Sequence, residues 1–251
     1  MSHLSDLPLA GKAAIVTGAS RGIGRAIALR LAEDGAAVAV NYRANSDAAE
    51  QVVDTIQRMG RNAVAVAADI ADPAQLRRLF AQAQAEFGGL DIVVNNAGTA
   101  VFSPILDVTE AMFDSMFATN TRGVFFSMQE AAKRLREGGR IVNISSGITI
   151  LGGPGGSVYG GTKGAIEQFT MAVAKELGPR GITVNTVSAG GTSTDLLDAA
   201  VPKEFQAAMA ANSPFGRIGQ PEDIADVVAF LCSHAGRWIT GQNIRATGGA
   251  A

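Results

Sequence analysis

Short apolar runs alternate with longer amphipathic stretches along the chain. Strand-like runs rich in Val, Ile and Ala occupy 13–16, 37–41, 63–67, 91–95, 140–145, 183–187 and 242–246. Stretches of helical length between them occupy 23–34, 47–59, 73–87, 111–136, 158–177 and 221–233. Short strands that are apolar throughout, each followed by a helix, are typical of a parallel sheet covered on both faces. The sequence therefore predicts an α/β fold, a doubly wound parallel sheet of about seven strands with helices on both faces.

The composition allows one sizeable core and excludes several classes of protein. With 251 residues, of which 47% are hydrophobic and 18% charged, we expect a single domain over 1–251. A net charge of -2 gives no electrostatic reason to expect nucleic acid or an anionic membrane as partner. A lone cysteine, Cys232, excludes an intrachain disulfide. The chain has only two histidines, His3 and His234, so no metal site is expected. Because no targeting signal or membrane-spanning run is recognisable, we expect a cytoplasmic protein.

A glycine-rich turn, Thr17 to Gly24, follows the first strand and opens into a helix. Glycines allow a tight turn and close backbone approach, and the free amides at a helix start suit a pyrophosphate. The spacing of Gly18, Gly22 and Gly24 differs from the general G-x-G-x-x-G fingerprint, so a purely structural turn is the alternative. Its place between strand and helix favours a dinucleotide loop, and hence a fold of Rossmann type.

The end of the second strand bears on the choice of cofactor. An acidic residue there usually holds the 2′-hydroxyl of NAD, whereas an arginine accommodates the 2′-phosphate of NADP. This strand ends Asn41, Tyr42, Arg43 without an acid, and Arg21 lies in the glycine turn. Two guanidiniums favour NADP(H), unless both are ordinary solvated charges.

Tyr159 and Lys163 are four residues apart, and Ser146 lies thirteen positions before Tyr159 at the end of a strand. A helix starting near Val158 projects the phenol and the ammonium from one face. A cation about 4 Å from a phenolic oxygen is worth roughly 4 kcal/mol at an effective dielectric near 20. We therefore expect Lys163 to lower the pKa of Tyr159 toward neutrality, where a phenol exchanges protons. The alternatives are a partly buried tyrosine and a serine that only forms a turn.

In order along the chain, these motifs resemble those of classical short-chain dehydrogenase/reductases. The motifs are 17–24, Asp69, Asn95 to Gly98, Asn120, Ser146, and Tyr159 with Lys163. The chain is most similar to 3-oxoacyl-carrier-protein reductases and NADPH-dependent ketone reductases. The resemblance implies that Tyr159 is the general acid and Ser146 a hydrogen-bond donor to the substrate oxygen. It also implies that Lys163 lowers the pKa of the tyrosine, and that Asn120 keeps a water beside the lysine.

The same resemblance extends the cofactor site over several loops. It implies that Asp69 contacts adenine, Asn95 the adenosine ribose region, and Thr194 the nicotinamide carboxamide. With the residues derived above, the expected NADP(H) site comprises Gly18, Ser20, Arg21, Gly22, Ile23, Gly24, Asn41, Arg43, Asp69, Ile70, Asn95, Ala97, Gly98, Tyr159, Lys163, Gly190, Thr192 and Thr194.

A substrate lid at about 190–215 is also implied by the resemblance. The expected pocket is formed by Ile148, Leu151, Gly153, Val158, Leu196, Leu197, Phe205 and Met209. Apolar walls suit a hydrophobic or extended carbonyl compound, although the lid residues could instead pack on the core. A carrier-bound acyl chain would need a basic rim, for which Lys133, Arg134, Arg136 and Arg180 are candidates, unless they only complement helix dipoles.

Three positions depart from the family pattern. Ala189 stands where a proline is usual, and Gly160 and Gly161 stand where alanines are common. Alanine frees φ and restores an amide donor, and helical glycines cost about 1 kcal/mol each. We therefore expect the entrance to the site to be less rigid than in relatives.

The main hypothesis is NADPH-dependent reduction of a ketone to a secondary alcohol. The alternatives are an NAD(P)-binding regulatory or scaffold protein without turnover, and an NADP-dependent alcohol dehydrogenase working mainly in the oxidative direction. A sugar-nucleotide epimerase is disfavoured because about 250 residues leave no room for its extra substrate region. The two long helices bearing Asn120 and Tyr159 resemble those that pair subunits in family tetramers, which predicts a homotetramer.

Overall fold

The apolar runs form one seven-stranded parallel sheet in the order β3-β2-β1-β4-β5-β6-β7. The computed structural model describes residues 7–251, so His3 lies outside the described residues. All seven predicted strands are present, with β5 beginning earlier than expected. Their bounds are β1 Ala13–Val16, β2 Ala37–Tyr42, β3 Ala63–Ala67, β4 Leu90–Asn95, β5 Leu135–Ser146, β6 Thr183–Ala189 and β7 Asn243–Ala246.

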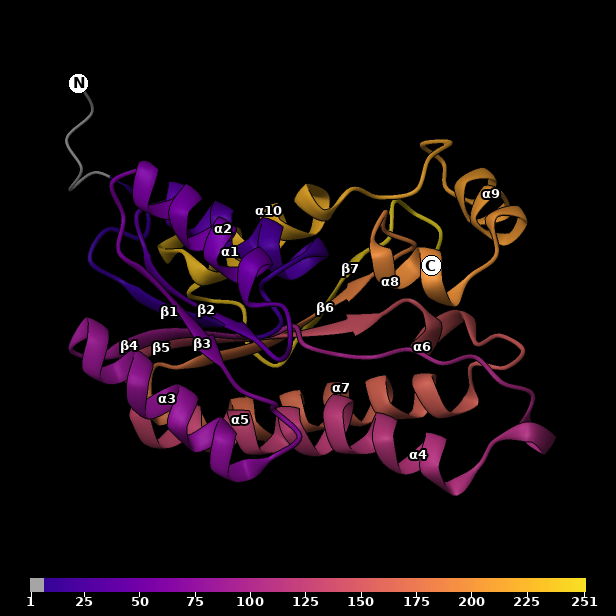
Figure 1. Ribbon diagram of the computed structural model, residues 1–251, viewed down its shortest axis with the longest axis horizontal. Coiled ribbons are helices and arrows are strands. Elements are labelled where there is room, and N and C mark those ends of the chain that lie inside the picture. The colour runs from indigo at the N-terminus through magenta and orange to yellow at the C-terminus, as the bar shows by residue number, and fades with distance from the viewer. Residues whose placement is uncertain (1–6) are drawn as a thin grey trace.

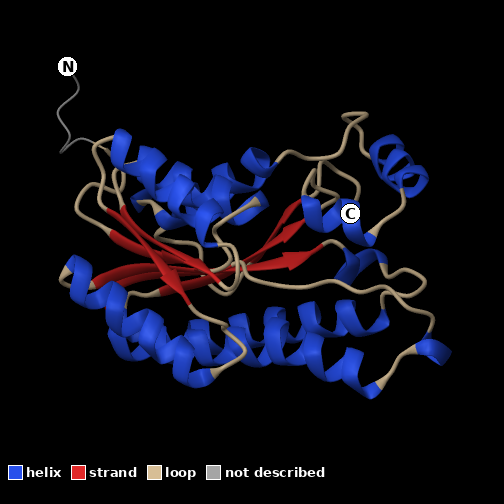
Figure 2. Cartoon of the chain, in the orientation of Figure 1, coloured by secondary structure: helices blue, strands red, loops and turns tan. Residues whose placement is uncertain are grey.

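Two helical layers enclose the sheet (Figures 1 and 2). Along β1, Ala14 and Val16 pack into one core and Ile15 into the other, because side chains alternate across a strand. The first core contains α1, α2 and α10, and the second contains α3, α5 and α7. Their bounds are α1 Gly22–Glu33, α2 Ser46–Arg58, α10 Pro221–Cys232, α3 Pro73–Phe87, α5 Val124–Arg134 and α7 Ser157–Leu177.

The predicted helix over 111–136 is interrupted. It consists of α4 (Glu110–Met116), a π-helical segment η3 (Phe117–Gly123), and α5. A π turn holds one residue more than an α turn and occurs mostly at functional sites. At Gly123 the backbone nearly touches another loop, because an added Cβ would lie 2.9 Å from the Ile70 carbonyl oxygen. Periodicity alone gave no sign of this break.

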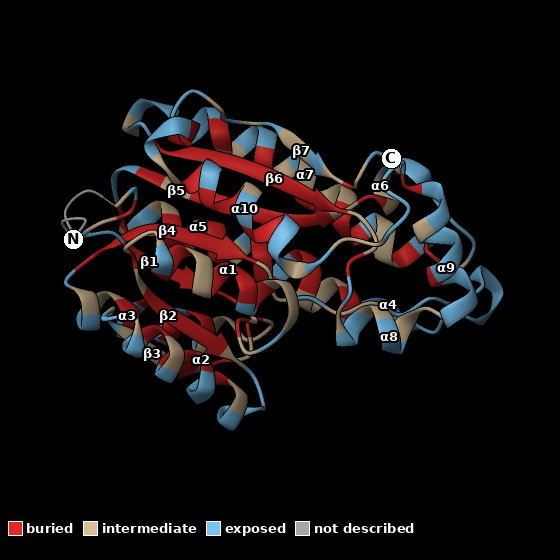
Figure 3. Ribbon diagram, turned by 90° about the horizontal axis from the view of Figure 1, so that it is seen from above, coloured by how far each residue is buried: buried red, intermediate tan, exposed pale blue. Residues whose placement is uncertain are grey.

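Short helices in the loops were not anticipated. They include α6 (Ile148–Leu151), and α8 (Asp195–Ala200) and α9 (Lys203–Asn212) within the expected lid. The 3-10 turns are η2 Ile105–Asp107, η4 Gly178–Arg180 and η5 His234–Gly236. Figure 3 shows α9 as a largely exposed helix beyond the carboxyl ends of the buried strands.

At Ala189 the backbone is part of the sheet, and the looser loop expected after it stays a prediction. Strand β6 continues through Ala189, which is buried and aligned in register with Ser146 of β5 and Ala246 of β7. Its carbonyl also accepts from the Gly147 amide at 2.9 Å. A proline here would have no amide to donate to the ladder, whereas alanine extends it.

Strand order reverses between β1 and β4, where the loops after these neighbouring strands diverge and leave a crevice. Ligands of doubly wound sheets bind at this edge. Over residues 7–251, no helix is both long and apolar enough to cross a membrane, and no three His, Cys, Asp or Glu side chains cluster as metal ligands.

Candidate active site

The glycine turn is shaped to receive an anionic group. Gly18 and Gly22 have φ of 63° and 54°, the left-handed region that favours glycine. An added Cβ on Gly24 would lie 2.3 Å from the Gly18 carbonyl oxygen, so only glycine fits where α1 crosses the turn. Arg21, the N-cap of α1, makes no side-chain capping hydrogen bond. The residues therefore fit the pyrophosphate of a dinucleotide, which binds helix-start amides.

Asn96 and Thr17 hold this turn against the loop after β4. The Thr17 hydroxyl accepts from the amides of Asn96 at 2.9 Å and Ala97 at 3.0 Å. The Asn96 side chain donates to the carbonyls of Thr17 at 2.9 Å and Gly18 at 3.2 Å. No role for Asn96 is predicted from the sequence, although a polar side chain directly after a buried strand is a sign of a residue at the ligand-binding edge of the sheet.

Two residues expected to contact the cofactor turn their side chains inward. Asn41 is buried, accepts from the Gly18 amide at 3.2 Å and donates to the Ala68 carbonyl at 3.0 Å. Asn95 is also buried and donates to Asn143 Oδ1 at 2.8 Å. Both side chains are thus structural in this arrangement, and for Asn95 only main-chain atoms remain available to a ribose.

The two candidate arginines differ in what they face. Arg43, 71% exposed, follows β2 and lies with Nη1 3.9 Å from Asp69 Oδ2, at the edge where an adenosine is expected. Arg21 instead pairs with Asp195 at the start of α8, with 3.4 Å between Nη1 and Oδ2. A phosphate contact by Arg21 would therefore require this ion pair to open.

The other expected cofactor residues lie in or near the loops after β1, β3, β4 and β6. A Cβ on Gly98 would lie 3.3 Å from Asn120 Oδ1 and 3.5 Å from Lys163 Nζ, and a Cβ on Gly22 would lie 3.2 Å from the Thr194 methyl. The Thr194 hydroxyl caps α8 by accepting from the Leu197 amide at 3.2 Å. Cofactor contacts by Ser20, Ile23, Ile70, Ala97, Gly98, Gly190, Thr192 and Thr194 remain predictions.

Lys163 is buried at the base of the site. Its ammonium donates to the Ile144 carbonyl at 2.9 Å, and Nζ lies 5.8 Å from the centre of the Tyr159 ring. Burial lowers the pKa of Lys163 to about 8, because desolvation disfavours the charged form. The helical spacing thus brings the pair together as predicted.

The expected effect of Lys163 on Tyr159 is wrong for the protein alone. Burial raises the pKa of the Tyr159 phenol, and a hydrogen bond from Ser146 partly opposes that rise. The estimate of about 4 kcal/mol assumed a fully charged lysine near the phenolic oxygen. Here the ammonium lies over the ring and is directed to a carbonyl, so it gives the phenolate little support.

Phe102, from the loop between β4 and α4, covers one side of the phenol. The ring centres of Phe102 and Tyr159 are 5.8 Å apart, tilted by 56°. The next residue, Ser103, donates its amide to the Gly155 carbonyl at 3.0 Å, which ties this loop to the one before α7. No sequence signal distinguished this phenylalanine.

Asn120 lies in η3 and is fully buried. Its side-chain oxygen accepts from the Thr99 amide at 2.9 Å, and its amide donates to the Thr99 carbonyl at 2.8 Å and to Thr162 Oγ1 at 3.2 Å. These contacts tie η3 to the loop after β4 and to α7. The water-holding role expected of Asn120 remains a prediction.

Only two of the eight expected pocket residues line the same cavity. Ile148 and Gly153 line a space of about 650 Å³ together with Pro104, Ile105 and the glycines of α7. The face of α7 that lines this space carries Gly160, Gly161 and Gly164. Tyr159 projects from a different face of the helix and is not among the lining residues. Of the other six, Val158 is buried, and Leu151, Leu196, Leu197, Phe205 and Met209 lie on α6, α8 and α9.

The expected basic rim does not border the site. Lys133 and Arg134 pair with Glu130, Arg136 pairs with Asp91, and Arg180 pairs with Glu137. Asp91 is near the start of β4, so this cluster lies at the amino end of the strands, opposite the edge that bears Ser146.

Known proteins share this fold and sequence. A family model described as enoyl-(acyl carrier protein) reductase matches residues 18–251. The hydroxynaphthalene reductase-like protein Arp2 of Metarhizium brunneum is 46% identical over 255 residues, covering 96% of each chain. A short-chain dehydrogenase from Burkholderia cenocepacia, solved with NADP, has a TM-score of 0.93 at 42% identity, covering 97% of this chain and 99% of its own. The angucycline C-6 ketoreductase LanV, solved with bound NADP, has a TM-score of 0.91 at 43% identity, covering 97% and 96%.

Fold and site together define a dinucleotide-binding oxidoreductase. The chain belongs to the short-chain dehydrogenase/reductase family.

Proposed function

We propose that this enzyme uses NADPH to reduce a ketone to a secondary alcohol. The observation that carries the proposal is the convergence of Tyr159, Ser146 and Lys163, with Lys163 close to Gly98 in the loop that packs against the glycine turn. A regulatory protein without turnover would have no reason to retain all three with Asn120. Oxidation of NADPH in the presence of a panel of ketones tests the proposal, and cofactor binding without turnover on any of them would contradict it.

Each residue has a separable task in this proposal. The bound NADPH supplies hydride. Tyr159 donates a proton to the substrate oxygen, and the Ser146 hydroxyl donates a hydrogen bond to it as charge develops. The pKa of Lys163 is about 8, so its ammonium is mostly charged at neutral pH. It can therefore supply a proton to restore the Tyr159 phenol after the phenol has donated its own. Asn120 fixes the backbone around them.

NADP(H) is the cofactor that the chain is suited to bind. The solved relatives from Burkholderia cenocepacia and LanV were crystallised with NADP. In this chain Arg43 stands at the end of β2, where a 2′-phosphate would be placed.

Replacing Arg43 with alanine is expected to weaken NADPH binding by roughly 1.5 to 3 kcal/mol and NADH binding little, since only NADPH has the phosphate. Dissociation constants from cofactor fluorescence measure both. The exposed Arg58, on α2, provides a matched arginine-to-alanine control. Equal losses for the two cofactors would show that Arg43 does not read the phosphate.

For the substrate, we favour a hydrophobic, aromatic ketone. Phe102 lies beside the proton donor with 38% of its surface exposed, and aromatic faces stack on aromatic compounds. The names of Arp2 and LanV refer to a hydroxynaphthalene and to an angucycline. A polycyclic ketone should therefore give a higher kcat/KM than an aliphatic ketone of equal size, and replacing Phe102 with alanine should remove that preference.

A 3-oxoacyl thioester is the second candidate, favoured by the enoyl-(acyl carrier protein) reductase description of the family model. Within one subunit the basic cluster lies at the opposite end of the strands from Ser146, so a free thioester, which needs no contact with a carrier protein, is the form to assay first. Because hydride transfer is reversible, the same panel run with secondary alcohols and NADP⁺ tests the oxidative alternative. A segment over 190–215 that closes on the substrate remains part of the proposal.

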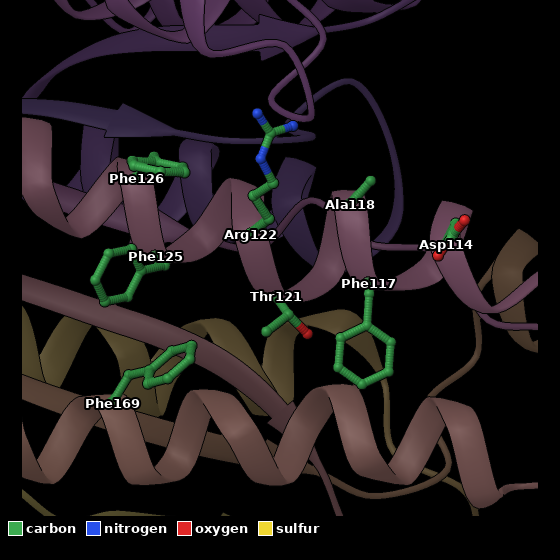
Figure 4. A pocket seen from close by; sticks show the side chains of 8 residues that line it. All are labelled: Asp114, Phe117, Ala118, Thr121, Arg122, Phe125, Phe126 and Phe169. Carbon is green, nitrogen blue, oxygen red and sulfur yellow. The ribbon is translucent and has the colours of Figure 1, made fainter.

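We also propose a homotetramer that uses the outer face of α4, η3, α5 and α7. Phe117, Phe125 and Phe169 line a hollow of about 470 Å³ on this face. Figure 4 shows how their side chains lie. Phe113 and Phe125 are 43% and 40% exposed, and apolar patches of this kind mark protein contacts.

The single buried Cys232 is compatible with a reducing compartment such as the cytoplasm.

Light scattering at micromolar concentration is expected to give a mass four times 25.7 kDa. Placing a charge in the hollow with Phe125→Glu should reduce that mass, whereas Phe205→Glu on exposed α9 should not. A monomer for the unchanged protein would contradict the assembly.

A further inference from the structure

Glu167 lies on α7 one turn beyond Lys163 and collects three hydroxyl groups on one carboxylate oxygen. Its Oε1 accepts from Ser145 Oγ at 2.7 Å, from Thr149 Oγ1 at 2.8 Å and, as the longer of two alternatives, from Ser188 Oγ at 3.3 Å. The nearer acceptor of the Ser188 hydroxyl is Asn243 Oδ1 at 2.8 Å. These donors come from three elements, the end of β5, the short helix α6 and the end of β6. One side chain therefore links α7 to both strands and to the turn between β5 and α7.

The three donors surround Ser146. Ser145 precedes it in the chain. The Thr149 hydroxyl also lies 3.0 Å from the Ser146 carbonyl oxygen, which is its alternative acceptor. Ser188 precedes Ala189, which pairs with Ser146 in the sheet and accepts from the Gly147 amide at 2.9 Å. Glu167 thus contacts the backbone support of Ser146 from both sides without touching Ser146 itself.

The direction of the Ser146 hydroxyl depends on that support. Its oxygen accepts from the Ile148 amide at 3.4 Å, in the first turn of α6. With the oxygen so engaged, the hydroxyl hydrogen is left to point at the phenol and at the substrate oxygen. Displacement of α6 would move the Ile148 amide, and the Ser146 hydroxyl would then no longer be held in this direction.

We propose that Glu167 is a positioning residue that holds the turn 145–151 so that the Ser146 hydroxyl faces the reacting oxygen. This inference rests on the proposed role of Ser146 in ketone reduction. A carboxylate suits the task because it only accepts hydrogen bonds, so a hydroxyl that bonds to it always does so as the donor. Hydrogen bonds to a charged acceptor are also about twice as strong as neutral ones. A glutamine has the same shape, but its NH₂ group can occupy the place of Oε1 and its oxygen is a weaker acceptor.

The test compares Glu167→Gln with Glu176→Gln, an exposed glutamate on the same helix. Amide hydrogen exchange, followed by mass spectrometry, reports on 145–152, where the amides of Gly147, Ile150 and Gly152 are hydrogen-bonded. We expect at least fivefold faster exchange there in Glu167→Gln only. We also expect kcat to fall at least tenfold while KM and the NADPH dissociation constant stay within twofold. Glu167→Asp, which keeps an acceptor-only group, should recover part of the rate.

Ser145→Ala removes one donor and leaves Glu167 in place, so it serves where Glu167→Gln lowers stability. If the two groups act through their hydrogen bond, the double variant should lose little more rate than either single variant. Unchanged exchange at 145–152 in both variants would overturn the anchoring. Faster exchange with unchanged kcat would overturn the positioning role. Absence of turnover in the unchanged protein is a failure of the proposed function, and the exchange result then decides the anchoring alone.

Discussion

Replacement of Tyr159 with phenylalanine is expected to lower kcat for ketone reduction by about 10²- to 10⁴-fold, the usual contribution of a positioned general acid. The phenylalanine ring retains the packing against Phe102 but has no proton to donate. Because the hydroxyl group is small and the glycine turn is untouched, the dissociation constant of NADPH should change little. Stopped-flow turnover and cofactor fluorescence measure the two quantities on the same sample.

Tyr42 is the only other tyrosine, so Tyr42→Phe is a matched control with kcat expected near that of the unchanged protein. It lies at the end of β2 and packs against the core. A rate for Tyr159→Phe within threefold of normal would refute proton donation by this phenol.

Replacement of Lys163 with methionine should abolish most turnover and yet stabilise the cofactor-free protein at neutral pH. The pKa of Lys163 falls from 10.5 to about 8 on burial. That difference corresponds to a cost on the order of 3 kcal/mol for holding the charged form inside the fold. Loss of the hydrogen bond from the charged ammonium to the Ile144 carbonyl offsets about 2 kcal/mol of the gain. A net rise of about 1 kcal/mol in the free energy of unfolding is expected at pH 7.

The sign of the pH dependence follows from the proton balance. Below pH 8 the lysine is charged in both states, and the folded state bears the full cost of burial. Between pH 8 and 10.5 the unfolded chain binds a proton that the folded chain does not, so this group makes the unchanged protein more stable as pH rises. The advantage of the methionine variant should therefore shrink across this interval.

Urea unfolding without cofactor at pH 7 and at pH 9.5 measures the effect. Lys175→Met, at an exposed lysine of the same helix, is the control, and its difference from the unchanged protein should not vary in this way. A Lys163→Met protein that is less stable at pH 7, or whose advantage grows with pH, would contradict the assigned pKa.

Most of the architecture could be read from the chain because its elements are locally encoded. The strands β1 and β3 and the helix α3 have the bounds expected from the apolar pattern. Asp72 and Pro73 mark the start of α3 by capping and by a fixed φ, signals that need no tertiary context. The break at η3 has no signal in the apolar periodicity, and the residues that it contacts, such as Ile70 beside Gly123, are distant in sequence.

The direction of side chains near the site could not be read in this way. Asn41 and Asn95 follow the expected spacing, yet both bind neighbouring strands and loops instead of facing the crevice. Lys133, Arg134 and Arg136 lie at the end of α5 and the start of β5, and the length of β5 separates them from Ser146. Spacing predicts a position along an element, whereas contacts from other elements decide what a side chain faces.

By itself, the sequence determined the parallel sheet, the glycine turn after β1 and the shared face of Tyr159 and Lys163, because each depends on residues close together in the chain. Tertiary structure alone decided the electrostatics of that pair. Burial of Tyr159 and Lys163 shifts both pKa values against the charged forms, and the Ile144 carbonyl takes the ammonium's hydrogen bond. Desolvation depends on what packs around a group from every side, which no local pattern records.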